Sequence, residues 1–359
     1  MDASAAQDQH SGAASADLTS RRSLVLVAGP PASGTSLLAG ILQQLGFHVP
    51  PPEMPADEAN ARGVAESRWV VDFHSRLMRQ SGVTVSDARP SSWARLAPVA
   101  LRPELEGELR RWLKKRFNDA DHVLVKDPRL PWFLPLWRRC ADELGVSPRF
   151  VTTLRHPAHL LQSETRSYGS WHGEISRIAA WLNQMLFTER ATRDMPRAYV
   201  RYREVVDDWP QVVARLADEL DLLAIRQASA SSMRRAEQFV DPALSRSRGD
   251  WGDRDVPPEL RQQAGEAWAL LLRIADGDGD SEDLRREFDA ARARYVAMYE
   301  NAEAVARSSI LAGQKRARRS GDRQHTAIVR MAERVPTKYR RRVPPRLRAR
   351  LARVLGRTA

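Results

Sequence analysis

The chain has 359 residues and a formal net charge of +12, with 42% hydrophobic and 28% charged residues. This length suits one large α/β domain with additions or two modest domains, and the average composition argues against general disorder. No apolar run approaches the roughly 20 residues of a membrane-spanning helix, and the single cysteine, Cys140, excludes an internal disulfide framework and a cysteine-built zinc cluster.

Most of the positive charge lies at the C-terminal end of the chain. Residues 315–359 hold 16 Lys and Arg against two acids, a balance of +14, which leaves −2 for residues 1–314. The main body is therefore nearly neutral, and we do not expect nucleic acid as its partner.

The N-terminal part of the chain predicts a leader, a strand and a helix. Residues 1–21 lack the basic start and apolar block of a secretory signal, so we expect a disordered leader on a cytoplasmic protein. The apolar run 24–28 predicts a buried strand, which a Gly-Pro-Pro turn ends. Apolar residues at helical spacing over 37–45 predict a helix, and Gly46 suits its end.

Strands and helices continue to alternate along the body. One apolar stripe at helical spacing predicts a helix over 64–80, and short apolar runs predict strands at 122–125, 149–154 and 198–202, each followed by a helix-like segment. This alternation predicts an α/β fold in which helices flank a parallel sheet. In such sheets the ligand lies beyond the carboxyl ends of the strands.

The C-terminal third differs from the body. We expect an α/β domain over 22–250, a helical extension over 251–312 and a basic tail over 313–359. Within 347–355, leucines and a valine share one helical face and arginines occupy the rest, a pattern typical of a helix on an anionic membrane surface. The pattern therefore predicts peripheral attachment at the inner face of the membrane, with nucleic acid or a disordered end as alternatives.

Gly29 and Gly34 stand at phosphate-loop spacing between the first strand and the first helix. The backbone N–H groups of such a loop and the helix N-terminus converge on an anion. Nucleoside triphosphatases need a lysine directly after the second glycine, where this chain has Thr35. The sequence therefore disfavours an ATP or GTP hydrolase while it predicts an anion site.

Further segments follow this loop in a fixed order. Together with Tyr202 in the fourth strand, the ordered set resembles the bacterial sulfotransferase family, and the resemblance extends over residues 23–248. The segments are Ser33-Gly34-Thr35-Ser36, Arg62-Gly63-Val64-Ala65-Glu66-Ser67, Lys126-Asp127-Pro128-Arg129, and Arg155-His156-Pro157 with Ser163.

This resemblance implies a P-loop-like fold and a metal-free transfer of the sulfuryl group of 3′-phosphoadenosine 5′-phosphosulfate (PAPS) to a hydroxyl or amine. The acceptor is a carbohydrate, a glycolipid or a small metabolite, and the sequence does not choose among them. Arg155 and Ser163 suit the 3′-phosphate, since one offers a fixed fork of donors and the other a hydroxyl. The nucleotide-binding residues that the resemblance implies are Ser33, Gly34, Thr35, Ser36, Arg129, Arg155, Ser163 and Tyr202.

The catalytic candidates are Glu66, Lys126 and His74. We expect Glu66 to be the general base, because it lies at the start of the predicted helix on the same inward face as Val70, where the helix dipole keeps a carboxylate ionised. His74 is rotated off that face by roughly 80° and is the second choice. Lys126 either stabilises the leaving group or forms a structural ion pair with Asp127.

One position departs from the family pattern. Two residues before Gly34 the family usually has Lys or Arg, which neutralises the leaving oxygen, and this chain has Ala32. Since stabilisation of developing charge is usually the largest catalytic effect, Lys126 or Arg129 must replace that cation if transfer occurs. A P-loop kinase and a non-catalytic nucleotide-binding or membrane-associated protein therefore remain as alternatives.

Overall fold

The computed structural model describes residues 22–56, 63–161, 173–241, 251–252, 254–277 and 280–334, without the side chains of 319–334. The predicted leader and the amphipathic stretch of the tail lie outside these residues. The chain divides into two units, Met1–Val296 and Ala297–Ala359. The second unit is described only as the continuation of helix α14 (Glu282–Arg334), which begins in the first unit.

A four-stranded parallel sheet organises the first unit. Its strands are β1 (Ser23–Ala28), β2 (His122–Lys126), β3 (Pro148–Leu154) and β4 (Arg197–Arg201), in the spatial order β2-β1-β3-β4. All three pairings are parallel, which confirms the predicted strands and their direction. Because β1 lies between β2 and β3, the loops that follow these three strands meet at one edge of the sheet.

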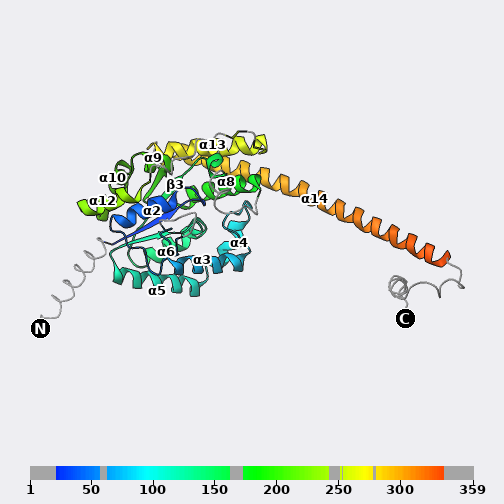
Figure 1. Ribbon diagram of the computed structural model, residues 1–359, viewed down its shortest axis with the longest axis horizontal. Coiled ribbons are helices and arrows are strands. Elements are labelled where there is room, and N and C mark those ends of the chain that lie inside the picture. Colours follow the sequence, from blue (N-terminus) through cyan, green and yellow to red (C-terminus); the bar gives the residue numbers. More distant parts are fainter. Residues whose placement is uncertain are drawn as a thin grey trace. The chain divides into compact units, whose positions relative to one another are not determined.

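Helices cover both faces of the sheet (Figure 1), and alternate residues of β1 enter two separate cores. Val25 and Val27 face one core and Leu24 and Leu26 the other, all of them fully buried. The helices over the first core are α2 (Thr35–Gln44), α9 (Tyr202–Asp207), α10 (Trp209–Glu219), α11 (Leu223–Arg226) and α12 (Ala230–Phe239). Those over the second are α3 (Arg68–Ser81), α4 (Ser92–Ala100), α5 (Pro103–Asp119), η1 (Leu130–Phe133) and α6 (Leu134–Asp142).

Helix α3 begins at Arg68, so the prediction that Glu66 lies in its first turn is wrong. The backbone around Glu66 pairs with an earlier segment: Met54 N–H donates to the Glu66 carbonyl, and Arg68 N–H donates to the Pro52 carbonyl, both at 2.8 Å. Ala65 has φ +51, in the left-handed region that interrupts a right-handed helix. Glu66 therefore approaches the body from an extended segment.

One helix from between β3 and β4 and two later helical stretches also pack together within the first unit. They are α8 (Glu174–Ala191), α13 (Pro258–Ala275) and the first residues of α14. The Tyr295 hydroxyl of α14 lies within hydrogen-bonding reach of the Ala88 and Ala179 carbonyls, and Arg193 pairs with Asp289 at 2.8 Å. The start of α14 is thus anchored in the body. None of the helices in the described parts of the chain combines the length and apolar character that crossing a membrane requires.

Candidate functional site

The glycine loop between β1 and α2 has a fixed conformation. Gly34 adopts φ +97 at the N-cap of α2, and a Cβ at this position would lie 2.3 Å from Cδ2 of Tyr202. Glycine is therefore required both for the backbone angle and for the close approach of the ring. Ser33 Oγ lies 2.8 Å from Thr153 Oγ1, which ties the loop to β3. This geometry presents the N-terminal N–H groups of α2 to an anion.

Arg155 follows β3 and reaches across to the glycine loop. Its Nη1 donates to the carbonyl of Ala32 at 2.7 Å, and its guanidinium carbon lies 4.5 Å from the centre of the Tyr202 ring. The side chain is mostly buried, and burial lowers the pKa of Arg155 from a value that is ordinarily far above neutrality. It stays a cation beside the loop. Tyr202 was predicted to be the last residue of the fourth strand, but it is the first residue of α9.

Ser163, the predicted partner of Arg155 at the 3′-phosphate, lies outside the described residues. His156 is described and has a structural position. Its Nδ1 accepts the Ala158 backbone N–H at 3.3 Å, and its ring makes edge contacts with Trp251 and Trp268. Burial, and to a smaller extent the neighbouring His159, lower the pKa of His156 to about 4. Its imidazole is neutral at physiological pH.

Lys126 joins the second strand to the glycine loop. Its Nζ donates to Glu66 Oε1 at 2.5 Å and to Ser36 Oγ at 2.9 Å, where Thr35 and Ser36 form the start of α2. Burial raises the pKa of Glu66, and the charge of Lys126 limits that rise. The structure thus brings two predicted catalytic residues together at the loop. The ion pair of Lys126 is formed with Glu66, in place of the pairing considered with Asp127.

His74 belongs to a buried polar chain. Trp137 Nε1 donates to His74 Nε2 at 2.9 Å, so the ring proton is on Nδ1, which lies 2.9 Å from Asp127 Oδ2. Burial lowers the pKa of His74 and keeps it neutral, while Asp127 opposes the shift. The prediction that His74 turns off the inward face of its helix is wrong, because its side chain is fully buried against Phe133.

Asp127 connects this chain to the end of β2. Its Oδ1 accepts the backbone N–H of Arg129 at 2.8 Å and the guanidinium of Arg129 at 2.9 Å. Burial alone would raise the pKa of Asp127, but the hydrogen bond with His74 and the charge of Arg129 lower it below its ordinary value. Asp127 therefore fixes the turn after Lys126 and holds Arg129 beside it. No group of three potential metal-ligating side chains occurs among the residues that the structure describes.

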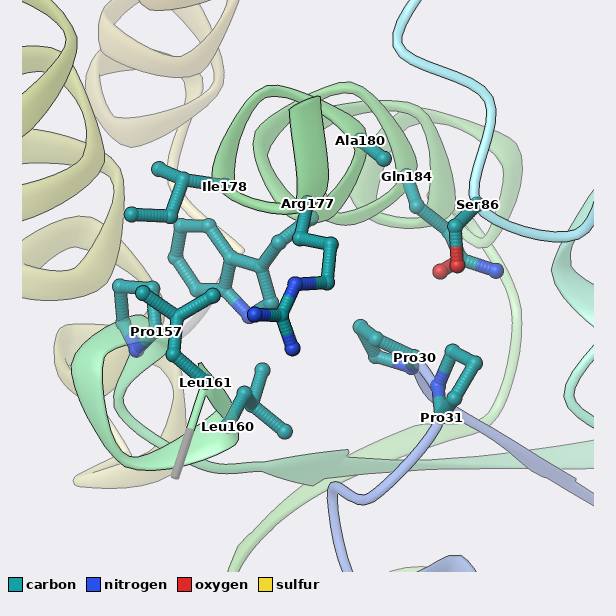
Figure 2. Close-up of a pocket in the computed structure, with 11 residues that line it drawn as sticks. Pro30, Pro31, Ser86, Pro157, Leu160, Leu161, Arg177, Ile178, Ala180 and Gln184 are labelled. Atoms are coloured by element: carbon teal, nitrogen blue, oxygen red, sulfur yellow. The ribbon is translucent and has the colours of Figure 1, made fainter. Parts of the chain in front are cut away.

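A narrow pocket adjoins the glycine loop (Figure 2). Pro30 and Pro31 of the loop line one side, and Arg177 and Gln184 of α8 line another. The Arg177 side chain points into the pocket. This pocket was not predicted from the sequence, because its walls come from segments more than a hundred residues apart. The only signal was on α8, where Arg177, Trp181 and Gln184 share one helical face.

Comparison with known proteins assigns no family. No family model matches the chain, and no curated protein matches it. Solved structures do resemble it, and three of them have 14–17% identity and TM-scores of 0.37–0.42. The sulfotransferase domain of a Synechococcus olefin synthase has 17% identity and a TM-score of 0.42, over 70% of this chain and 94% of that one.

Two further solved structures are similar in the same range. The sulfotransferase domain of the curacin biosynthetic pathway has 14% identity and a TM-score of 0.40, over 70% of this chain and 98% of that one. A Mycobacterium tuberculosis sulfotransferase has 16% identity and a TM-score of 0.37, over 73% and 80% of the two chains. At this level of similarity, function has to be inferred from the residues of the site itself.

Proposed function

We propose that the chain is a sulfotransferase that moves the sulfuryl group of PAPS to a hydroxyl or amine acceptor. The observation that carries this proposal is the convergence of two cations on one glycine loop: Lys126 from the end of β2 and Arg155 from the end of β3. With Thr35 in place of the triphosphatase lysine, the site combines a phosphate cradle with cations on both sides of it.

The donors suit a nucleotide that is phosphorylated at both its 3′ and 5′ positions. The N-terminus of α2, with the hydroxyls of Thr35 and Ser36, would hold the 5′-phosphosulfate. Arg155 would hold the 3′-phosphate through its fork of N–H donors, and Tyr202 would border the adenine. PAPS supplies the activated sulfuryl group when it is bound.

Glu66 and Lys126 would perform complementary parts of the transfer. Glu66 takes the proton of the acceptor hydroxyl as that oxygen forms its bond to sulfur. Lys126 stabilises the negative charge on the bridging oxygen as the bond from sulfur to the 5′-phosphate breaks, in place of the cation that is missing at Ala32. The products are a sulfate ester and 3′,5′-bisphosphoadenosine, and the proton remains on Glu66.

Their ion pair links the two events. When Glu66 becomes protonated, Lys126 loses its negative partner at the moment when the leaving oxygen gains charge. His74 cannot serve in the same way, because Trp137 occupies its unprotonated nitrogen. We therefore assign the base to Glu66 and a positioning role to His74.

A P-loop kinase is the second candidate, favoured by the contact between Lys126 and Ser36, which places a lysine near the phosphate loop from another strand. Thermal unfolding with 3′,5′-bisphosphoadenosine or with MgATP separates the two functions. A ligand at 100 times its Kd stabilises the folded protein by about 2.7 kcal/mol, and we expect this effect from bisphosphoadenosine. Stabilisation by MgATP but not by bisphosphoadenosine would contradict the proposed sulfotransferase function.

An assay of sulfuryl transfer tests the alternative that the chain is a non-catalytic nucleotide-binding protein. With radiolabelled PAPS and a panel of hydroxyl and amine acceptors, we expect labelled product that depends on Lys126. Binding of bisphosphoadenosine without labelled product from any acceptor would favour the non-catalytic alternative.

A further inference from the structure

The middle of helix α14 is exposed over about five turns. Every residue from Glu300 to Arg318 is exposed. Five large hydrophobic side chains are exposed in the described part of the chain, and three of them, Val305, Ile310 and Leu311, lie in this stretch. Helices in folded proteins owe most of their stability to the packing of an apolar face. Within the described residues of one chain, nothing covers this stretch.

One side of the exposed stretch is apolar. Residues at the spacing i, i+3, i+4, i+7, i+8 and i+11 share one face of a helix. From position 302 onward these residues are Ala302, Val305, Ala306, Ser309, Ile310 and Gly313. None of them is charged, whereas Glu303 and Arg307, which lie outside the face, form an ion pair at 2.8 Å. The stretch is therefore an amphipathic helix with an open apolar face.

A membrane surface fits this face poorly. Helices that lie on membranes bury large side chains such as Trp, Phe and Leu. Here Val305 and Ile310 are the only large side chains of the face, and the leucine of the stretch, Leu311, lies on the opposite side. The acids Glu300 and Glu303 would also be repelled by anionic lipids. Small side chains instead allow a second helix to approach closely, so the face fits a helix better than a lipid surface.

The charges of the stretch indicate which helix this is. Residues 300–308 hold two acids and one arginine, whereas residues 310–318 hold one lysine, two arginines and no acid. A second copy running in the opposite direction places the acidic half of each helix beside the basic half of the other. A copy running in the same direction would place Arg316, which lies on the apolar side just past Gly313, against itself.

We infer that two copies of this chain pair through the apolar face of α14 as antiparallel helices centred on Ser309. The face meets itself about a two-fold axis, which is the usual symmetry of a homodimer. Arg316 of one copy then lies level with Ala302 of the other, where a small side chain leaves it room, and Arg318 lies level with Glu300. This pairing does not depend on the proposed sulfuryl transfer.

The oligomeric state of the full chain tests the pairing. Light scattering after size-exclusion chromatography should give twice the mass of the 40.5 kDa chain. Val305→Glu combined with Ile310→Glu buries two charges per copy in the face, so it should raise the dimer Kd in sedimentation equilibrium by about 100-fold. Both side chains are exposed and glutamate is a good helix former, so the body and α14 should keep their structure.

Leu311→Glu is the matched control, because Leu311 is an exposed large side chain of the same helix that lies outside the apolar face. It should leave the dimer Kd unchanged. Circular dichroism and thermal unfolding of each variant show whether the helix and the body are intact.

Single cysteines test the direction of the second helix. Ser309→Cys should form a disulfide between the two copies, because position 309 faces itself at the centre of the pair. Ala302→Cys should not, since at 1.5 Å per residue the two positions 302 lie about 21 Å apart, well beyond the roughly 7 Å that a disulfide can span. The natural cysteine, Cys140, is buried, and the unchanged chain measures any disulfide that it forms.

A chain that stays monomeric at all concentrations would overturn the inference. If that monomer binds phosphatidylserine-containing vesicles and loses this binding in the Val305→Glu, Ile310→Glu variant, the membrane is the occupant of the face and the inference is wrong. Equal dimer Kd values for the natural chain and the double variant, or an equal rise in Leu311→Glu, would place the dimer interface elsewhere. A disulfide in Ala302→Cys, or none in Ser309→Cys, would overturn the antiparallel pairing.

Discussion

Two cations reach the glycine loop from opposite sides of β1, and they are held in different ways. Arg155 donates to a backbone carbonyl and lies against the ring of Tyr202, so its charge does not depend on a proton elsewhere. Lys126 pairs with the carboxylate of Glu66, whose charge changes with one proton. The first arrangement suits lasting attachment of an anion, and the second suits charge that moves during a reaction.

The largest expected effect comes from removing the proton acceptor on the Lys126 side. Loss of a general base typically costs a factor of 10²–10⁴ in rate, so Glu66→Gln should lower kcat by about that factor and leave bisphosphoadenosine affinity nearly unchanged. Asp72→Asn, which alters an exposed carboxylate of α3, is the control. Normal turnover by Glu66→Gln would show that the base lies elsewhere.

Because the pKa of Glu66 is raised, kcat and the free energy of unfolding should both depend on pH, and Glu66→Gln should change these dependences. Only ionised Glu66 accepts a proton, so kcat should rise with pH through a pKa above the ordinary value of 4.5. Folding has the opposite dependence: the folded state favours protonated Glu66, so the free energy of unfolding falls as pH rises through that pKa. Chemical denaturation at several pH values should show this fall in the natural chain and its loss in Glu66→Gln.

Removing the cation of the reactive pair should have the next largest effect. Loss of one group that stabilises developing negative charge costs about 10²–10³ in kcat, which we expect for Lys126→Met. If Lys126 replaces the cation that is absent at position 32, adding Ala32→Lys to this variant should restore part of the rate. If the double variant unfolds normally but is as slow as Lys126→Met, Lys126 does not act by stabilising the leaving oxygen.

Substitution of Arg155 should have a smaller effect, which is confined to the affinity for the nucleotide. Arg155→Ala should weaken bisphosphoadenosine by about 10- to 100-fold, the value of a charge-assisted hydrogen bond, and adenosine 5′-phosphosulfate much less, because that ligand lacks the 3′-phosphate. Arg203→Ala, at an exposed arginine of α9, is the control. If calorimetry shows equal losses of affinity for both nucleotides, Arg155 does not bind the 3′-phosphate.

The comparison also shows which parts of the site a sequence can predict. The strands were predicted because residues such as Val25 and Leu26 are buried on opposite faces, which leaves a continuous apolar run. The glycine loop was predicted because Gly34 must adopt a positive φ directly before a helix. Both signals are local, and a few neighbouring residues carry them.

Contacts between distant segments were not predictable in the same way. The late start of α3 follows from the pairing of the Glu66 backbone with Met54, which leaves no periodicity in the sequence. The buried position of His74 follows from its partners Asp127 and Trp137, which lie 53 and 63 residues away. Helical spacing alone placed His74 off the core, because it counts only apolar neighbours as buried.

The contact between Arg155 and Ala32 has a consequence for folding during synthesis. These residues are 123 positions apart. At a synthesis rate of about 5–20 residues per second, Ala32 is added to the chain roughly 6 to 25 seconds before Arg155. Until then β1 also lacks the neighbour β3, which holds Ser33 through Thr153. The nascent loop therefore has neither its cation nor its fixed backbone, and the anion site forms only after the chain has grown past β3.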